Sequence, residues 1–510
     1  MAQRTLSGEP YELAGSRMVF TNWYYVRPGG FAWRSASGEW LGTQASAGAF
    51  DGRYSSEDCP RGIRLAVQPA QCGGPIIEPE QPWETGPSIS INTVLRDGAT
   101  YRAWASNLYF ESKDGVNWER PKLGLTDWNG SRENNLLPLA IANATVFRDP
   151  SAKPEERYKF VREHFYSAED FEAFKKRRPG AWEPRTDRQD ANLIFGVQGA
   201  VSPDGLRWSI LPEPLVMEHS DTQVTACYDE RLGKYVMYTR NWMVGPRSAR
   251  VEGYSTASWL EVARRSIGRS ESADFRNFPL SDVILVPPPE MLPSDLLYTN
   301  CYTTIPRAPD HRVMFPTIWH AAVSDSTTVR MASSYNGDHW HFLPNSEVLD
   351  SAPFGEWDGG CVFAVPNLIE LANGDFALPY NGYNVPHKYP RKGHYQVRPG
   401  YAVWPKGRLV ALEAPEVGEF ATVAIMPPGR KLRINALTAR AGEVRIEAAN
   451  MADRKPLAGR SFADADAVRG DCHWTPVTWR GNDDLGHADG APVVLRFRMR
   501  NARIYGLEFE

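Results

Sequence analysis

The sequence predicts an all-β protein in which a five-bladed β-propeller is followed by a C-terminal β-sandwich. Three observations predict this fold: a strand–turn–strand pattern that occurs five times, a recurring hairpin motif that ends in tryptophan, and a change to plain alternation near the C-terminus. The composition agrees, because 12% of the 510 residues are aromatic and 42 glycines and 40 prolines accompany them. Runs with helical periodicity are scarce. Such a chain is typical of many short strands joined by turns.

The hairpin motif joins a serine, a tight turn and an aromatic residue. It occurs at SKDGVNW (112–118), SPDGLRW (202–208) and SYNGDHW (334–340), with a degenerate copy at SESADFRNF (270–278). Asp-Gly or Asn-Gly supplies the positive φ that a tight hairpin needs, and the tryptophan anchors the turn between neighbouring sheets. We therefore expect the acids of these turns, Asp114 and Asp204, to be structural.

The strand–turn–strand pattern runs out of phase with the hairpins. Its five copies are 91–106, 143–163, 224–240, 301–319 and 361–380. Each first strand is apolar enough to be buried on both faces. Four strands per unit, repeated five times, form a propeller whose radial closure leaves few exposed edges. This assigns residues 85–405 to the five blades and residues 1–84 to a segment that packs on the propeller or closes its ring.

Residues 406–510 lack both repeats. Apolar and polar side chains alternate there, as in LRINALTA (432–439), EVRIEAA (443–449) and PVVLRFRMR (492–500). Alternation of this kind predicts a β-sandwich, which we expect to brace one edge of the propeller.

Charge and composition exclude several classes of partner. The chain has 57 Lys and Arg against 61 Asp and Glu and no basic stripe, so we expect no nucleic-acid partner. No apolar run approaches the roughly 18 residues of a membrane helix, and the first residues lack a secretory profile, so we expect a cytoplasmic protein without a membrane partner. The six cysteines show no zinc spacing. We expect no cofactor, while a structural calcium in the channel stays an open alternative.

Chain direction predicts which residues face a ligand. Propellers bind at one end of the central channel, where first strands begin and second strands end. Acids at such positions suit glycosidic bond cleavage, in which one carboxylic acid protonates the leaving oxygen and a second carboxylate attacks or activates water. The candidate catalytic residues are Asp221 and Asp358, with Glu84, Glu163 and Asp295 as alternates.

The other polar and aromatic residues at these positions predict substrate binding, because aromatic faces stack on sugars and Arg or Asn fixes hydroxyl or carboxylate groups. These candidates are Arg162, Arg240, His219, His320, Trp319, Tyr380, Tyr383, His387 and Asn135. A purely structural role stays open for many of them: Asp221 would cap a strand end, Asp358 would fix the Gly359-Gly360 turn and Glu84 would pair with an arginine. Three basic excursions, 167–190, 244–266 and 385–400, would suit an anionic sugar or form a solvated surface.

The chain resembles the invertase, levanase and arabinanase clan of glycoside hydrolases, families 32 and 43, and its hairpins are similar to the Asp-boxes of sialidases. It most resembles a set of uncharacterised glycosidase-like proteins with PWE, SxDGxxWxxPxLGL…NN, DTQ and WDGG patterns. These patterns stand here at Pro82-Trp83-Glu84, at 112–135, at Asp221-Thr222-Gln223 and at Trp357-Asp358-Gly359-Gly360. The resemblance implies glycosidase activity and, because the third blade supplies the proton donor in that clan, favours Asp221.

The chain also departs from the clan. It has no WMNDPNG-type nucleophile motif, while Arg148-Asp149-Pro150 matches the clan's Arg-Asp-Pro. The internal repeat nevertheless aligns Asp149 with Asp97 and Asp229, at the turn between the first two strands of a blade. A turn aspartate followed by proline is common, so the repeat favours a structural role for Asp149.

These observations predict a glycoside hydrolase, exo-acting on an oligosaccharide or glycoside that is furanosidic or contains a uronate. Two alternatives stay open. One is a lyase that acts on a uronate through histidine, tyrosine and arginine, with candidates His164, His320, Tyr380, Tyr383, His387 and Arg391. The other is a carbohydrate-binding propeller without catalysis. Unsaturated product would identify the lyase, and the absence of any product would identify the binder.

Overall fold

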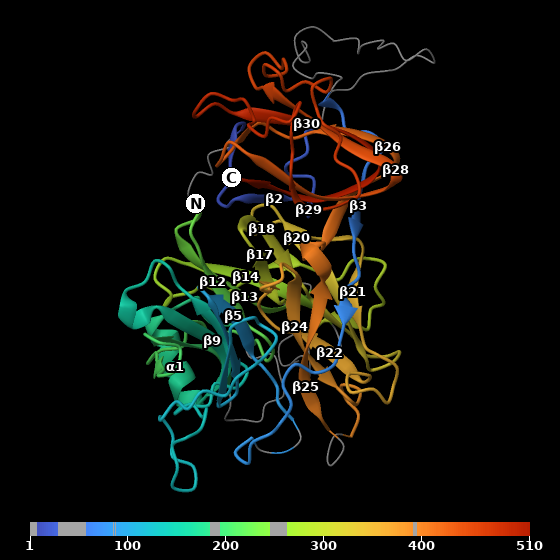
Figure 1. Ribbon diagram of the computed structural model, residues 1–510. Coiled ribbons are helices and arrows are strands. Elements are labelled where there is room, and N and C mark those ends of the chain that lie inside the picture. The colour runs from blue at the N-terminus through green and yellow to red at the C-terminus, as the bar shows by residue number, and fades with distance from the viewer. Residues whose placement is uncertain are drawn as a thin grey trace.

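The computed structural model describes residues 8–28, 58–84, 86, 88–183, 194–244, 263–390 and 395–510. Figure 1 shows a propeller with a second β-rich domain stacked on one side of it. The predicted all-β class and the five-bladed propeller are confirmed. Every predicted strand–turn–strand segment contains the first of two consecutive main strands of a blade and all or most of the second.

The first three blades are simple antiparallel sheets in chain order. Blade 1 consists of β5 (Thr93–Asp97), β6 (Thr100–Ala105) and β7 (Leu108–Ser112). Blade 2 consists of β8 (Thr145–Arg148), β9 (Tyr158–Tyr166), β10 (Ile194–Ser202) and β11 (Ser209–Ile210), with the short 3-10 helix η2 (Pro154–Glu156) between its first strands. Blade 3 consists of β12 (Thr225–Asp229), β13 (Lys234–Met243), β14 (Arg264–Ser272) and β15 (Asp282–Leu285).

The last two blades carry additional strands. Blade 4 consists of β16 (Asp295–Leu297), β17 (Tyr302–Ile305), β18 (Ala308–Met314), β19 (Thr317–His320), β20 (Thr327–Ser334) and β21 (His341–Asp350). Blade 5 consists of β22 (Cys361–Ala364), β23 (Ile369–Glu370), β24 (Phe376–Tyr383), β25 (Val397–Trp404) and β4 (Gln71–Cys72), a strand from the N-terminal segment that pairs with β25. The short 3-10 helix η3 (Pro405–Gly407) follows.

Hydrogen bonds between first strands join the blades around the channel. Thr93 of blade 1 accepts from the backbone N–H of Val146 at 2.9 Å, and Thr225 of blade 3 donates to Asn300 at 2.7 Å. Thr145 of blade 2 and Thr303 of blade 4 likewise bond the next blade, and between blades 5 and 1 the side chain of Asn381 exchanges two bonds with the backbone of Ile91. These bonds pair buried polar groups of one blade with those of the next.

The aspartates at the first turn of blades 1 to 3 are structural. Asp97 accepts from Tyr158 of the next blade. Asp149 accepts from Tyr235 of blade 3 at 2.7 Å and forms a buried ion pair with Lys159 at 2.8 Å. The structure thus places Asp149 at the turn after β8, as the repeat predicts, and shows that it binds the next blade there.

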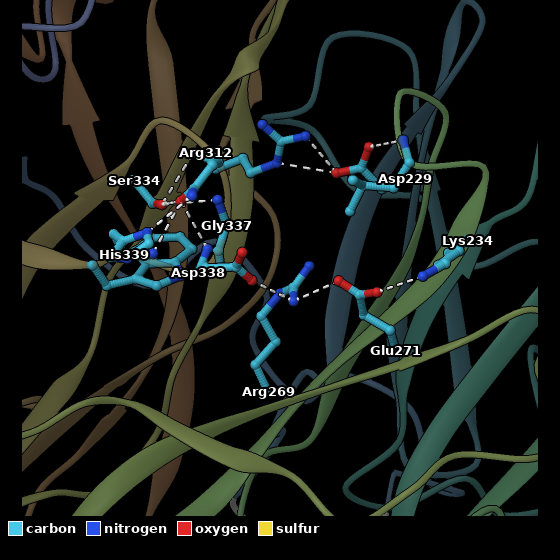
Figure 2. A network of polar contacts seen from close by, with 12 residues as sticks. Asp229, Lys234, Arg269, Glu271, Arg312, Ser334, Gly337, Asp338 and His339 are labelled. Carbon is cyan, nitrogen blue, oxygen red and sulfur yellow. Dashed lines mark hydrogen bonds and ion pairs between the residues drawn. The ribbon is translucent and has the colours of Figure 1, made fainter. Parts of the chain in front are cut away.

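Figure 2 shows the equivalent contact between blades 3 and 4. Arg312 donates to one carboxylate oxygen of Asp229 at 3.0 Å and 2.5 Å, and both side chains are 8% exposed. Arg269 lies beside them and pairs with Asp338 of the hairpin at 334–340 at 2.6 Å. The hairpin turn is closed by its own residues, since Ser334 accepts from the backbone N–H of Gly337 at 2.8 Å.

Removing Arg312 is expected to cost much of the stability of the propeller. In Arg312→Met the Asp229 carboxylate stays buried without its partner, which typically costs about 3–5 kcal/mol. Lys234→Met is the matched control, because Lys234 is exposed and its partner Glu271 keeps an ion pair with Arg269; loss of such a surface pair costs about 1 kcal/mol or less. Urea denaturation compares the two variants, and equal losses of unfolding free energy would contradict the assignment.

The second domain is one hydrogen-bonded sheet of eight strands. Its strands are β1 (Tyr11–Glu12), β2 (Arg17–Val19), β3 (Arg64–Val67), β26 (Val410–Ala421), β27 (Ile425–Met426), β28 (Leu432–Asn450), β29 (Asp471–Pro476) and β30 (Val493–Phe509). Both halves of the long strands β28 and β30 bury side chains in one core, and their register shifts between Thr438 and Glu443. The sheet therefore bends around its own core.

The N-terminal segment connects the two domains. Its strands β1 to β3 belong to the second domain, whereas β4 belongs to blade 5. Arg17 on β2 is 3% exposed and lies between Glu370 of blade 5, at 3.0 Å, and Glu508 of β30, at 2.9 Å. This buried charge cluster fixes the second domain on the propeller.

One α-helix, α1 (Ala168–Arg177), stands within the first basic excursion. Ser167 and Asp170 form a capping box, and Phe171 and Phe174 are buried. A serine three residues before an acid is a helix-start signal, and the helical spacing of the two phenylalanines agrees with it. In the part of the chain that is described, no helix has the length and apolar character needed to cross a membrane.

Candidate active site

A pocket of about 360 Å³ lies in the propeller and draws residues from all five blades. Four blades contribute the residues just before or at the start of their first main strand, so these positions lie around one pocket. The contributing residues are Ser90–Asn92, Asn143 with Thr145, Asp221–Gln223, Tyr298 with Thr299, and from blade 5 Phe363–Val365, Asn381, Tyr383 and His387.

Asp221 is the carboxylate that lines this pocket. It precedes β12 and pairs with two buried arginines, Arg240 of β13 and Arg265 of β14, the latter at 2.9 Å. Burial raises the pKa of Asp221, but the two guanidinium groups outweigh this and hold the pKa below its ordinary value. Because its side chain is still 36% exposed, Asp221 presents a negative charge to the pocket at neutral pH.

Glu163, near the end of β9 in blade 2, is not one of the residues that line the pocket, but it binds the pocket residue Asn143 and lies close enough to Asp221 for the charge of Asp221 to act on it. It accepts a hydrogen bond from Asn143 at 3.1 Å, and its Oε2 is buried without a hydrogen-bond partner among the described residues. Burial and the charge of Asp221 raise the pKa of Glu163 to about 7, which the Asn143 bond and nearby arginines moderate. Glu163 therefore holds a proton in the pH range where Asp221 is ionised.

Asn143 connects Glu163 to the pocket. Its φ is 59°, in the left-handed region that asparagine tolerates better than most residues. This backbone conformation places it directly before β8, where its amide lines the pocket and donates to Glu163.

His219 lies beside Asp221. Its ring stacks on Phe195 of β10 with centroids 4.0 Å apart and planes at 13°. Burial and the nearby charge of Arg240 lower the pKa of His219 to about 3, so the imidazole is neutral near pH 7. Arg240 binds the backbone carbonyl of His219 at 3.2 Å as well as Asp221, and so fixes the whole loop before β12.

Aromatic side chains form another wall of the pocket. His387 meets Tyr298 edge-on at 4.7 Å, Trp319 at 4.9 Å and Phe363 at 5.5 Å. Tyr383 packs edge-on against Phe363 at 5.2 Å. Sugar rings pack on such surfaces while polar groups fix their orientation.

Gln223 forms the polar floor of the pocket. It donates to the carbonyl of Ala364 in blade 5 at 2.9 Å and accepts from the backbone N–H of Cys301 in blade 4 at 2.6 Å. The side chain of Gln223 thus connects blade 3 to blades 4 and 5 within the pocket lining.

Asp358 and Tyr380, two predicted site residues, lie on the opposite face of blade 5. Tyr380 donates to Asp358 at 2.8 Å, and the Cβ atom of Asp358 packs against Gly382. Residues 381 and 383 line the pocket, so residues 380 and 382 point away from it. The predicted pair of Asp221 with Asp358 is therefore not brought together.

The other predicted residues have partners away from the pocket. Glu84 pairs with Arg120 at 2.6 Å, and this bond together with two backbone donors holds its pKa below the ordinary value against the effect of burial. Asp295 and His320 hydrogen-bond each other at 3.0 Å on neighbouring strands. Asn135 binds the Trp83 side chain and a backbone carbonyl. Arg162 binds the Gln198 side chain and the backbone carbonyl of Ala140, and Trp319 binds Asp325.

Arg265, Tyr298 and Asn143 were not among the predicted site residues. The sequence repeat could have indicated Asn143, because Asn92 stands at the equivalent position before the first strand of blade 1 and lines the same pocket. Arg265 lies in the excursion 244–266, where the pattern marked no strand. Arg391, one of the six lyase candidates, lies outside the described residues.

Two further acids are buried behind His219. Glu183 accepts from the backbone N–H of His219, and Glu218 accepts from Thr239 and Ser281. Burial and the charge of Glu218 raise the pKa of Glu183 to about 8. Within the described ranges, no group of three or more His, Cys, Asp or Glu side chains is arranged to hold a metal ion.

Solved structures similar to this chain are known, at low sequence identity. No family model and no curated protein matches the sequence. Similar solved structures include an N-acetylgalactosamine deacetylase from F. plautii in complex with blood group B trisaccharide, which is 13% identical with a TM-score of 0.41 over 67% of this chain and 95% of that one. An α-L-arabinofuranosidase from Podospora anserina in complex with cellotriose is 12% identical with a TM-score of 0.39 over 66% and 96%.

A thermostable family-43 glycoside hydrolase is 14% identical with a TM-score of 0.35 over 65% and 91% of the two chains. Several of the similar structures are thus glycoside hydrolases. Likeness at this level says nothing about the substrate or the reaction of this chain.

Proposed function

We propose that the protein is a glycoside hydrolase that cleaves a glycoside or oligosaccharide in the pocket at Asp221. The observation that carries this proposal is the pair Glu163 and Asp221, two carboxyl groups from adjacent blades whose pKa values are shifted in opposite directions. Such a pair supplies one protonated acid and one ionised carboxylate at the same pH.

Each carboxyl group has a role in the proposed reaction. Glu163 donates its proton to the glycosidic oxygen as the bond to the anomeric carbon breaks and its electrons pass to that oxygen. Asp221 faces the positive charge that develops on the sugar and either attacks the anomeric carbon or takes a proton from the attacking water. Arg240 and Arg265 keep Asp221 ionised and oriented.

The size of the pocket favours exo-action. A volume of about 360 Å³ is near the lower end of ligand pockets, about 300–1,000 Å³, and suits one sugar ring. The aromatic wall around His387 would pack on that ring, and Asn92, Asn381 and Gln223 supply polar groups near its hydroxyls. A furanoside or a uronate-containing sugar remains our proposed substrate class.

A lyase is the second candidate, favoured by Tyr383 and His387, which both line the pocket. In that reaction a neutral side chain would remove the proton next to a uronate carboxylate, and the bond to the leaving oxygen would break with formation of a double bond in the sugar.

One screen separates these functions. The purified protein is incubated with a panel of aryl glycosides and with uronate-containing oligosaccharides, and released aglycone and ultraviolet absorbance are read together. We expect aglycone release without unsaturated product. Unsaturated product would replace the hydrolase with the lyase, and binding without either product would leave a carbohydrate-binding propeller.

A further inference from the structure

Beyond Glu163, blade 2 continues as an exposed aromatic surface that the proposed chemistry has not used. Phe165 on β9 is 45% exposed, and its cross-strand partner Phe195 on β10 is half-buried. The two rings lie 4.6 Å apart with their planes at 46°. Apolar side chains that are exposed as a contiguous patch mark a binding surface more often than single exposed apolar residues do.

The strand pattern fixes the direction of these rings. Val161, Glu163 and Phe165 alternate along β9 and so share one face of the blade, which their partners Val197 and Phe195 extend on β10. Val161 and Val197 pack in a core cluster with Val224 and Ala226 of blade 3. This face of blade 2 is therefore directed at blade 3, where Asp221 lies.

A continuous series of ring contacts connects Phe165 to His219, which lies beside Asp221. Phe165 contacts Phe195 at 4.6 Å, and Phe195 stacks in parallel on His219 at 4.0 Å. His219 stands two residues before Asp221, and its imidazole is neutral near pH 7 because burial and Arg240 lower its pKa. The exposed end of the stack is thus an apolar surface that begins beside Glu163.

We propose that Phe165 and Phe195 form the binding site for the leaving group of the substrate. This inference rests on the proposed function, because the leaving group lies on the side of the acid that protonates it. Glu163 is that acid, and Phe165 is the next residue outward on the same face. The occupant is the ring attached to the cleaved oxygen, with an apolar face that packs on Phe165.

The shared chemistry of the occupant is a flat or nearly flat ring. A sugar ring with axial hydrogens on one face and an aryl aglycone both have it. Packing of such a ring on an exposed aromatic side chain buries apolar area on both partners, and two aromatic rings attract each other beyond that burial.

The test compares ligands that differ only in the leaving group. The probes are the 4-nitrophenyl and methyl glycosides of the sugar that the screen selects, or of L-arabinofuranose where it selects none, together with the corresponding disaccharide. Dissociation constants are measured by calorimetry in the Glu163→Gln background, so that the ligand is not consumed. Phe165→Ala, Phe165→Leu and Tyr335→Ala are compared.

Tyr335→Ala is the matched control, because Tyr335 is 43% exposed and lies in the hairpin turn of blade 4, away from the pocket lining. We expect the 4-nitrophenyl glycoside or the disaccharide to bind roughly tenfold more tightly than the methyl glycoside. Phe165→Ala should abolish this ratio, Phe165→Leu should retain part of it and Tyr335→Ala should leave it unchanged. Preference for the disaccharide alone would identify the occupant as a sugar, and preference for the nitrophenyl ring alone as an aryl aglycone.

A ratio that survives Phe165→Ala, a ratio of one in the parent protein or absence of binding by every probe would overturn the inference. Failure of the proposed function is a separate result, because it appears as absence of hydrolysis by the wild-type protein in the screen. A protein that binds the ring through Phe165 and hydrolyses nothing would therefore retain the binding site and lose the hydrolase.

Discussion

Asp221→Asn is expected to lower kcat/KM by about three to four orders of magnitude, the upper part of the range for loss of a catalytic acid or base. The loss should be similar for substrates with poor and good leaving groups, because the anomeric carbon needs the negative charge of Asp221 in every case. The variant also leaves Arg240 and Arg265 without their carboxylate. Initial rates over a range of substrate concentrations measure the effect, and circular dichroism shows whether the fold survives.

Asp358→Asn is the matched control for Asp221→Asn. Asp358 is the other carboxylate that the sequence favours, but it binds Tyr380 on the face of blade 5 opposite the pocket. An asparagine oxygen can still accept from Tyr380, so we expect a change in kcat/KM of no more than a few fold. A large loss in Asp358→Asn together with an active Asp221→Asn would place the chemistry elsewhere.

Glu163→Gln is expected to lower kcat/KM by about 10²–10⁴-fold for substrates whose leaving group must be protonated. The same variant should hydrolyse a glycosyl fluoride at nearly the wild-type rate, because fluoride leaves without protonation by a general acid. Glutamine keeps the shape of the protonated glutamate and its hydrogen bond to Asn143, so the variant removes the proton and little else. Equal losses on both substrates would contradict the role of Glu163 as acid.

The pH profile tests the same role. The active form of Glu163 is protonated, so with its pKa raised to about 7 the wild-type kcat/KM should fall tenfold per pH unit above about pH 7. The acid limb should lie below the ordinary range of an aspartate, because the pKa of Asp221 is lowered. Glu163→Gln should lack the alkaline limb on the fluoride.

Asn143→Gly is expected to shift the alkaline limb of the pH profile rather than to abolish activity. The amide of Asn143 stabilises the ionised form of Glu163, and its removal should raise the pKa of Glu163 and move the alkaline limb to higher pH. Glycine is chosen because residue 143 has a positive φ. A limb that moves to lower pH would contradict the hydrogen bond as the cause.

The sequence located the strands and one end of the channel well. The segment 224–240 contains β12 and most of β13, and Asp221 before it lines the pocket as expected. These features are local, because strand alternation and turn residues are set by neighbours in the chain. The repeat also identified Asp149 as a structural turn residue, since Asp97 and Asp229 hold the same place in other blades.

The choice between carboxylates needed the tertiary structure. Asp221 and Asp358 look alike in the sequence, each just before a first strand. Near a strand end, a shift of one residue turns a side chain to the other face, and the loop of Asp358 packs on Gly382, away from Asn381 and Tyr383. Glu163 was only an alternate, because its raised pKa depends on burial and on a charge from another blade.

The sequence by itself determined the blades, the turns that join them and the end of the channel where polar residues gather. Only the tertiary structure decided which acids meet and how they titrate, because Glu163 and Asp221 are far apart in the chain and come together through the packing of blade 2 on blade 3. It also decided that β4 completes blade 5 and that Arg17 connects the two domains. The pKa of a side chain and the face toward which it points depend on its neighbours in space. The sequence indicates such neighbours only where an internal repeat aligns equivalent positions.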